Sequence, residues 1–444
     1  MRRYVCETVL AVAVIFFVTA GIYSRSLHAP FVFDDSTHIE RNPAIRIEKV
    51  DLGSLACAAF GSPDRNRPVT NLSFALNYRV GGYNVRGYHV TNMVIHALSG
   101  VLAFVFVRAS FARLAVLSDV LLRTDARRIF ELSIFSALIF VVHPVQTEAV
   151  TYVVQRATAL SAMFSFLALL AYVQARSTTK VWLRWLLGCG AGLAWLLGLG
   201  SKETAAVLPL VTLLYDWYFF ADLRRNWLRK GFGLLALYIL FSAVIAYVYF
   251  HGRPVEWFAE RYSRASFSMW QRLLTETRVV VFYLSLLFFP HPSRINLIHR
   301  FPTSVSMFDP PSTFLSFATI VGLVGLGVLC AGKERWVSFC IFWYLIWLAL
   351  ESSVLPLWII FEHRLYLSAL SFAALVPYLF HRWLRRPRWL LPVLLSTGVL
   401  LMSGASYVRN GVWTSAEGLW RDVISKNPDS PVAHGNLGDI MPVS

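Results

Sequence analysis

The sequence predicts an all-α polytopic membrane protein, because long apolar segments recur, charged residues are scarce and many cations lie in short loops. Of its 444 residues, 57% are hydrophobic and only 15% are charged. A soluble chain carries about a quarter charged residues. Apolar segments of about 20 residues are long enough to cross a bilayer as helices. The five cysteines are scattered, which fits neither a disulfide framework nor a zinc site.

Hydropathy predicts eleven transmembrane helices. The first covers about 5–24, and we expect it to be retained because it is long and lacks a clear small-residue cleavage site. The others lie at about 88–107, 129–145, 155–174, 184–200, 204–220, 232–250, 312–331, 337–351, 365–381 and 389–408. The apolar segment 277–290 is too short to span comfortably, and a span there would place basic loops outside. We therefore predict that it is re-entrant or interfacial.

The net charge of +16 reflects topology rather than nucleic-acid binding. Lys and Arg gather in the loops 108–128, 175–183 and 221–231, and such loops face the cytoplasm in membrane proteins. The N-terminus is therefore predicted to be cytoplasmic. The polar segment 25–87 and the C-terminal tail are predicted to be extracytoplasmic, in a bacterial inner membrane or the endoplasmic reticulum.

Two domains are expected: a membrane-embedded domain, 1–408, and a tail, 409–444. The tail contains Asn427-Pro428-Asp429, a helix start, followed by an Ala-x-x-Asn-Leu-Gly pattern that is typical of a tetratricopeptide repeat. One partial repeat cannot bury its own apolar face. Either the chain is truncated within a repeat array, or the match is due to chance.

Unusual polar residues gather next to apolar segments on the predicted outer side. Asp34 and Asp35 follow the first span, where carboxylates are costly unless they are solvated, paired or used. We predict that they face a water-filled cavity and that at least one is a catalytic base. Nine further candidates lie in other outward turns and at span ends: Arg67, His89, His143, Glu148, Arg156, Lys202, Glu203, Arg364 and Tyr366.

These residue types fit the transfer of a sugar from a lipid phosphate. The reaction needs a base for the acceptor hydroxyl and positive charge for the departing phosphate. Arg156, Lys202 and Arg364 are the candidate phosphate-binding cations, and the other six residues are candidates for the cavity lining. Neighbouring side chains of an extended chain point in opposite directions. One aspartate would then be the base, and the other would orient it or bind a metal or cation; either assignment is open.

Each candidate also has a structural interpretation. The two aspartates could cap a helix or pair with Arg41. The three phosphate-binding candidates could be interfacial anchors. His96 and His143 near apolar faces could be packed core residues, and Glu148 and Glu203 could satisfy neighbouring cations.

The ordered motifs resemble a known family. They include "FDDSTHIERNPAI", "HPVQTEAVTYVVQRATALSAMFSFLALLAY", "SKETAAVLPLVTLLYDW" and "EHRLYL". Together they resemble the transmembrane and tetratricopeptide-repeat (TMTC) protein O-mannosyltransferases and their bacterial relatives, within the GT-C glycosyltransferase superfamily. The acidic signature of that superfamily falls on Asp34 and Asp35. The family's arginine falls on Arg364, and His363 stands between it and Glu362, where the family has Glu and Arg adjacent.

The resemblance implies an inverting transfer of a sugar, often mannose, from a polyprenyl- or dolichyl-phosphate carrier to a protein Ser/Thr hydroxyl outside the cytoplasm. The expected partners are the lipid carrier and a protein acceptor, and a need for a divalent metal is left open. One alternative is transfer to a lipid or glycan acceptor. Others are a polytopic transporter, which would need paired half-helices in related halves, and a scaffold that binds partners through its tail.

Overall fold

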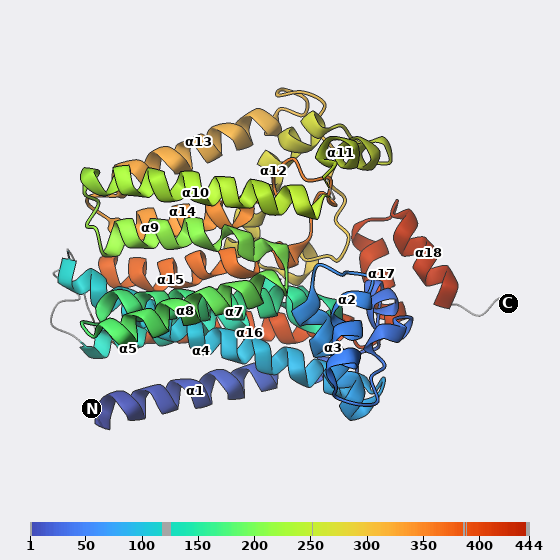
Figure 1. Ribbon diagram of the computed structural model, residues 1–444, viewed down its shortest axis with the longest axis horizontal. Helices are drawn as coiled ribbons and strands as arrows, with labels where there is room; N and C mark the ends of the chain where they lie inside the picture. The colour runs from blue at the N-terminus through green and yellow to red at the C-terminus, as the bar shows by residue number, and fades with distance from the viewer. Residues whose placement is uncertain (1, 118–125, 251, 385–386, 388, 441–444) are drawn as a thin grey trace.

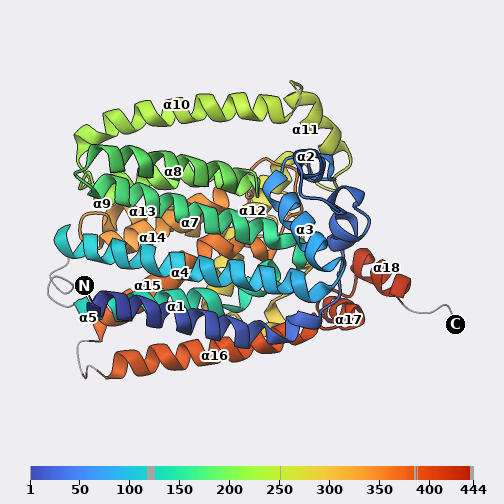
Figure 2. The same ribbon diagram turned by 60° about the horizontal axis from the view of Figure 1, so that its bottom comes forward.

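Long helices run side by side in the computed structural model, which describes residues 2–117, 126–250, 252–384, 387 and 389–440 (Figures 1 and 2). No β-strand occurs in the described residues, so the predicted all-α class is confirmed. A helix lies at every expected span: α1 Arg2–Tyr23, α4 Val85–Leu117, α5 Ala126–Val142, α7 Arg156–Ser177, α8 Val181–Leu199, α9 Leu208–Phe219, α10 Arg225–Tyr249, α13 Ser312–Cys330, α14 Arg335–Ala349, α15 Leu365–Trp383 and α16 Leu390–Val412.

The other described helices lie between these or after them. They are α2 Leu52–Gly61, α3 Pro68–Gly81, α6 Thr147–Thr151, α11 Pro254–Ser263, α12 Met269–Phe288, α17 Ala416–Lys426 and α18 Pro431–Ile440. Single turns of 3-10 or π type are η1 Ser24–His28, η2 Ser36–Glu40, η3 Pro43–Ile45, η4 Pro144–Gln146, η5 Val153–Gln155, η6 Glu203–Val207, η7 Pro292–Arg294 and η8 Glu362–Arg364.

The helices support a multi-pass membrane protein. Among the described residues, 7 helices are long and apolar enough to cross a membrane, or up to 8 if the bent pair Ala126–Val142 and Pro144–Thr151 is one span. Helices α9 and α14 have 12 and 15 residues, and they pack inside the bundle, where side chains such as Tyr215 and Trp343 are buried. The count of eleven spans stays a prediction.

Helix α12 begins earlier than the apolar segment 277–290 suggested. Ser268 and Gln271 form a capping box that starts it. Hydropathy excluded its first two turns because of Arg272 and Glu276, whose side chains are buried and 2.7 Å apart. Arg272 also donates to the backbone carbonyls of the 351–357 segment. The helix therefore includes two charged residues, which form an ion pair with each other inside the protein. A re-entrant or interfacial position of α12 stays a prediction.

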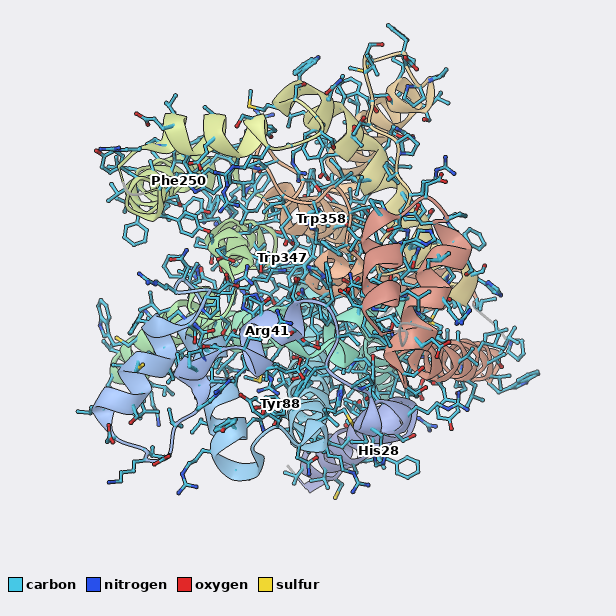
Figure 3. The ribbon with its side chains drawn as sticks, turned by 90° about the vertical axis from the view of Figure 1, so that its right-hand side faces the viewer. His28, Arg41, Tyr88, Phe250, Trp347 and Trp358 are labelled. Carbon is cyan, nitrogen blue, oxygen red and sulfur yellow. The ribbon has the colours of Figure 1, made fainter. Side chains whose placement is uncertain are left out.

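The segments expected to face outward meet at one end of the bundle, which carries α2, α3, α11, α17 and α18 and is called the α2/α3 end here (right in Figure 1). The basic loops 175–183 and 221–231 lie at the opposite end (Figures 1 and 2). Figure 3 looks onto the α2/α3 end, where Tyr88 lies on the side of α3 and Trp358 lies across the centre from it. Which end faces the cytoplasm stays a prediction from charge.

The tail forms two helices at this end, α17 and α18, joined by the short segment 427–430. Leu419, Trp420 and Val423 of α17 and Ala433 of α18 are buried in one apolar cluster. That cluster also contains Tyr152, so the tail packs on the membrane-embedded part. The division at residue 408 and the repeat-like character of the tail stay predictions.

Candidate functional site

The acidic turn, residues 33–35, begins with a strained residue. Phe33 has a φ of 51°, in the left-handed region that residues other than glycine uncommonly adopt. Its ring packs 6.4 Å from that of Tyr152 and 5.8 Å from that of Trp420, measured between centroids. Strain of this kind persists only where the surrounding structure holds it, and it concentrates at functional sites. The turn is thus held by side chains from the α6–α7 connection and from α17.

The two aspartates of the turn have different environments. Asp35 is only 1% exposed, and its carboxylate accepts the N–H groups of Val32 at 3.1 Å and Val154 at 2.7 Å. The Asp34 side chain is exposed, and its backbone N–H donates to the hydroxyl of Tyr152 at 2.9 Å. The two side chains point in different directions because the backbone forms a helical turn, with φ −56° and ψ −35° at Asp35, and not the extended chain that was expected. Asp35 anchors the turn, and Asp34 is available to a substrate.

Electrostatics also distinguish the two carboxyl groups. Burial raises the pKa of Asp34, against a hydrogen bond with Tyr152 and the charges of His38 and Arg67. Burial raises the pKa of Asp35 to about 8, although two backbone N–H groups oppose the shift. A general base is most effective when its pKa lies near the working pH. The upward shift at the exposed Asp34 therefore suits proton abstraction.

Two of the three predicted phosphate-binding cations come together around one carboxylate. The Nζ of Lys202 lies 3.1 Å from Oε1 of Glu351, and the Nε of Arg364 lies 3.8 Å from the same oxygen. All three side chains are buried. We call Lys202, Glu351 and Arg364 the cationic cluster. They come from the α8–η6 turn, the end of α14 and η8, so the cluster depends on tertiary packing.

The partners of the cluster leave one donor unused. Lys202 donates to Oγ1 of Thr158 at 3.0 Å. Arg364 donates to the carbonyls of Trp358 at 2.6 Å and Ile359 at 3.0 Å. In the described part of the chain, the buried Nε of Arg364 has no hydrogen-bond partner. A buried donor without a partner is costly and calls for an explanation, such as a ligand that is bound in function.

A second carboxylate lies near Arg364. Glu276 lies 2.7 Å from Arg272 and 4.0 Å from Arg364. Lys202 and Arg364 therefore share the carboxylate of Glu351, and Arg364 also lies near that of Glu276.

Arg67 and Glu203 form an ion pair. The guanidinium of Arg67 lies 3.1 Å from Glu203 and 3.0 Å from Asp64. The positive charge of Arg67 also acts to lower the pKa of Asp34, although burial outweighs it. Glu203 therefore satisfies a neighbouring cation, which matches its structural interpretation.

Arg156 does not join Lys202 and Arg364. Its Nε donates to Oδ1 of Asn92 at 2.6 Å, and its terminal nitrogens donate to the carbonyls of Ser73 at 3.1 Å and Tyr88 at 3.0 Å. Its guanidinium lies 4.7 Å from the centre of the Phe74 ring. Arg156 is fully buried, and these contacts tie α3, α4 and α7 together.

Three other predicted lining residues are also interior ties. Nε2 of His89 bonds to the carbonyl of Ala29, and Nε2 of His143 bonds to the carbonyl of Leu287, both at 3.0 Å. The Tyr366 hydroxyl lies 2.6 Å from Nδ1 of a buried core histidine. The placement of His143 matches the structural interpretation of a packed histidine, and so does that of His96, the histidine that Tyr366 contacts. None of these polar atoms bonds a member of the cationic cluster.

The inserted His363 has a clear place. Glu148 accepts the N–H groups of Glu362 at 2.8 Å and His363 at 3.2 Å. Burial, together with the charge of Lys202, lowers the pKa of His363 well below its usual value. The imidazole is therefore neutral, and its Nδ1–H donates to Glu148 at 2.7 Å. Glu148 thus orients the turn that carries Arg364.

Sequence reasoning missed several members of this network: Glu351, Arg272, Glu276 and His299, which lies 2.7 Å from Glu362. The only signal for Glu351 was its position as the last residue of the predicted span 337–351, and the other three carried none. In the described residues, no group of three or more His, Cys, Asp or Glu side chains could hold a metal ion.

No protein-family model matches the chain, and no solved structure matches it. Curated proteins do. A protein O-mannosyl-transferase of Caenorhabditis elegans is 26% identical over 435 residues, which cover 94% of this chain and 58% of that protein. TMTC2 of Mus musculus is 32% identical over 219 residues, 46% of this chain and 24% of that protein. TMTC4 of Homo sapiens is 35% identical over 165 residues, 34% of this chain and 21% of that protein.

The matched region spans at most 58% of the length of these three relatives. All three are named protein O-mannosyl-transferases. The match to the Caenorhabditis elegans protein includes both the acidic turn and the cationic cluster, since it covers 94% of the chain. This chain is therefore similar along nearly its whole length to one protein O-mannosyl-transferase, and over 46% and 34% of its length to TMTC2 and TMTC4.

Proposed function

We propose that this chain is a GT-C glycosyltransferase that moves mannose from a polyprenyl- or dolichyl-phosphate carrier to a Ser/Thr hydroxyl of a protein, at the extracytoplasmic membrane face. The names of the related proteins support the sugar and the protein acceptor. The observation that carries the proposal is the exposed Asp34 on a strained, anchored turn, together with the buried cations Lys202 and Arg364, which share one carboxylate.

In this proposal Asp34 removes the proton from the acceptor hydroxyl. The hydroxyl oxygen attacks the anomeric carbon of the sugar, and the bond from that carbon to the carrier phosphate breaks on the opposite face. The bonding electrons leave with the phosphate, so the anomeric configuration inverts. Lys202 and the unused Nε–H of Arg364 stabilise the negative charge that develops on the phosphate oxygens. Asp35 keeps Asp34 in place and does not exchange a proton with the substrate.

Glu351 has a defined part in this scheme. Its carboxylate holds Lys202 and Arg364 together before the donor binds. When the donor binds, its phosphate competes with Glu351 for the same two cations. Because Glu351 has already brought them together, both cations lie close to the position where negative charge develops. Charged donors in a buried site stabilise an oxyanion more strongly than they would in water.

The direct test uses the purified full chain in lipid nanodiscs with radiolabelled mannosyl-phosphate polyprenol and a Ser/Thr-rich acceptor protein. We expect label on the acceptor with the wild type and a matched control, Glu48→Gln, which removes an exposed carboxylate of the same outward segment. We expect none with Asp34→Asn. Label on a lipid or free glycan would reassign the acceptor. Equal labelling by wild type and Asp34→Asn would refute the role of Asp34.

A further inference from the structure

A charged cavity lies at the α2/α3 end, and the proposed catalytic groups do not line it. It has a volume of about 290 Å3 and lies between α12, the 293–302 segment and α17. Four cations line it: Arg278, Arg294, Arg300 and Lys426. None of its lining residues belongs to the acidic turn or the cationic cluster. The volume is just below the range of small-ligand cavities, which begins at about 300 Å3.

Two of these cations are held rigidly but lack a carboxylate partner. Arg278 donates to the carbonyl of Pro302 at 2.8 Å, and its guanidinium lies 4.9 Å from the Phe301 ring centre. Arg294 donates to Oγ of Ser285 at 2.6 Å. In the described part of the chain, neither guanidinium forms an ion pair with Asp or Glu. A guanidinium has five N–H donors, and these contacts leave several of them for a ligand.

The carboxylates near the cavity belong to other groups. Arg300 pairs with the exposed Asp429 at 3.1 Å. Lys426 pairs with Asp422 at 2.7 Å, and Asp422 also binds a second arginine, Arg409. Burial and the charge of Arg409 lower the pKa of Lys426. Glu362 accepts from His299, which also lines the cavity. Positive charge is therefore in excess, and it is centred on Arg278 and Arg294.

The cavity lies beside exposed aromatic side chains. Phe288 and Phe289, at the end of α12, are 53% and 69% exposed. The carbonyl of Phe289 accepts from Arg294 at 3.1 Å. Apolar rings beside a cation can contact the acyl chains of a lipid while the cation binds its phosphate group.

We infer that this cavity binds a phosphate group, carried by an anionic phospholipid headgroup or by a free phosphate compound. Two preorganised guanidiniums can each donate a pair of charge-assisted hydrogen bonds to phosphate oxygens. The flanking phenylalanines favour the lipid source. This inference does not depend on the proposed transferase activity, and its test does not measure that activity.

The test compares two probes on the purified full chain. Native mass spectrometry compares how much phosphatidylglycerol and how much phosphatidylcholine stay bound to the protein, and this ratio reports headgroup binding. Inorganic pyrophosphate at constant ionic strength, measured by the shift in unfolding temperature, reports free phosphate binding. The test variant is Arg278→Gln with Arg294→Gln. The matched control, Arg253→Gln with Arg264→Gln, removes two exposed charges at and after the ends of α11.

We expect the double variant to weaken the preferred probe about tenfold or more relative to wild type and control, since a hydrogen bond to a charged group contributes about 1.5–3 kcal/mol. Preference for phosphatidylglycerol alone assigns the headgroup, and a pyrophosphate shift alone assigns a free phosphate; either supports the site. Because Arg278 and Arg294 also bind backbone carbonyls, the single variants Arg278→Gln and Arg294→Gln, each of which removes one of these contacts, are measured beside the double variant. The inference is wrong if the wild type prefers neither probe. It is also wrong if the folded double variant, or both folded single variants, bind like the control.

Discussion

Replacing each aspartate of the acidic turn separately tests the division of labour between them. Asp34→Asn leaves a side chain of the same shape on an exposed position, so we expect the free energy of unfolding to change by less than about 0.5 kcal/mol. Loss of a general base lowers the rate about 10²- to 10⁴-fold, which corresponds to about 3–5 kcal/mol of activation free energy. Mannose transfer should fall by that factor in folded protein.

Asp35→Ala should show the opposite pattern. It removes the acceptor of two buried N–H groups, those of Val32 and Val154. Each buried donor without a partner costs about 1–3 kcal/mol, so the free energy of unfolding should fall by about 2–6 kcal/mol. The assay is the initial rate of label transfer per mole of monodisperse protein, together with thermal unfolding. The reasoning is refuted if Asp34→Asn keeps more than half of the wild-type rate, or if Asp35→Ala unfolds at the wild-type temperature.

Four further outcomes are expected. Lys202→Met leaves Glu351 buried without its nearest cation, which should cost about 3–5 kcal/mol of stability. The same variant should raise the KM for the lipid donor. Adding Glu351→Gln should restore the stability but leave the KM raised. Burial raises the pKa of Asp35 from 3.8 to about 8, so the folded state holds a proton that the unfolded state releases. Unfolding temperature should therefore fall as pH rises from about 4 to 8, and Asp35→Asn should flatten that slope. Arg156→Gln should lower the unfolding temperature but leave the KM of the folded fraction unchanged, because its partners are structural. Trp420→Ala removes a buried ring and should cost about 3–5 kcal/mol, seen as faster proteolysis of the tail.

Hydropathy predicted the positions of the helices well, because a helix that faces lipid or is buried has a mainly apolar sequence. It placed the start of α12 too late, because Arg272 and Glu276 form an ion pair inside the protein. A window average cannot distinguish a buried ion pair from a solvated one. Hydropathy also cannot tell a helix that spans the membrane from a shorter buried one, such as α9 with 12 residues and α14 with 15.

The site could be predicted only in part. Lys202 and Arg364 lie in turns that were predicted to face the same side of the membrane, so the predicted topology already indicated that they could lie close together. Arg156 met the same criterion, but Asn92 and the carbonyl of Tyr88 occupy its donors, and those contacts depend on the crossing of α4 and α7. The different environments of the two aspartates depend on the backbone of Phe33 and on an amide from a distant part of the chain. Neither leaves a pattern in a single sequence.

The ring of Phe33 has one further consequence. It sits against Trp420, so the beginning and the end of this chain meet at the residue that aims Asp34. The tail therefore stabilises the conformation of the acidic turn. A movement of α17 away from the bundle would release Phe33 to an ordinary backbone conformation, and Asp34 would swing with it. Whatever displaces or steadies that helix can thereby tune the position of the proposed base from outside the membrane-embedded helices.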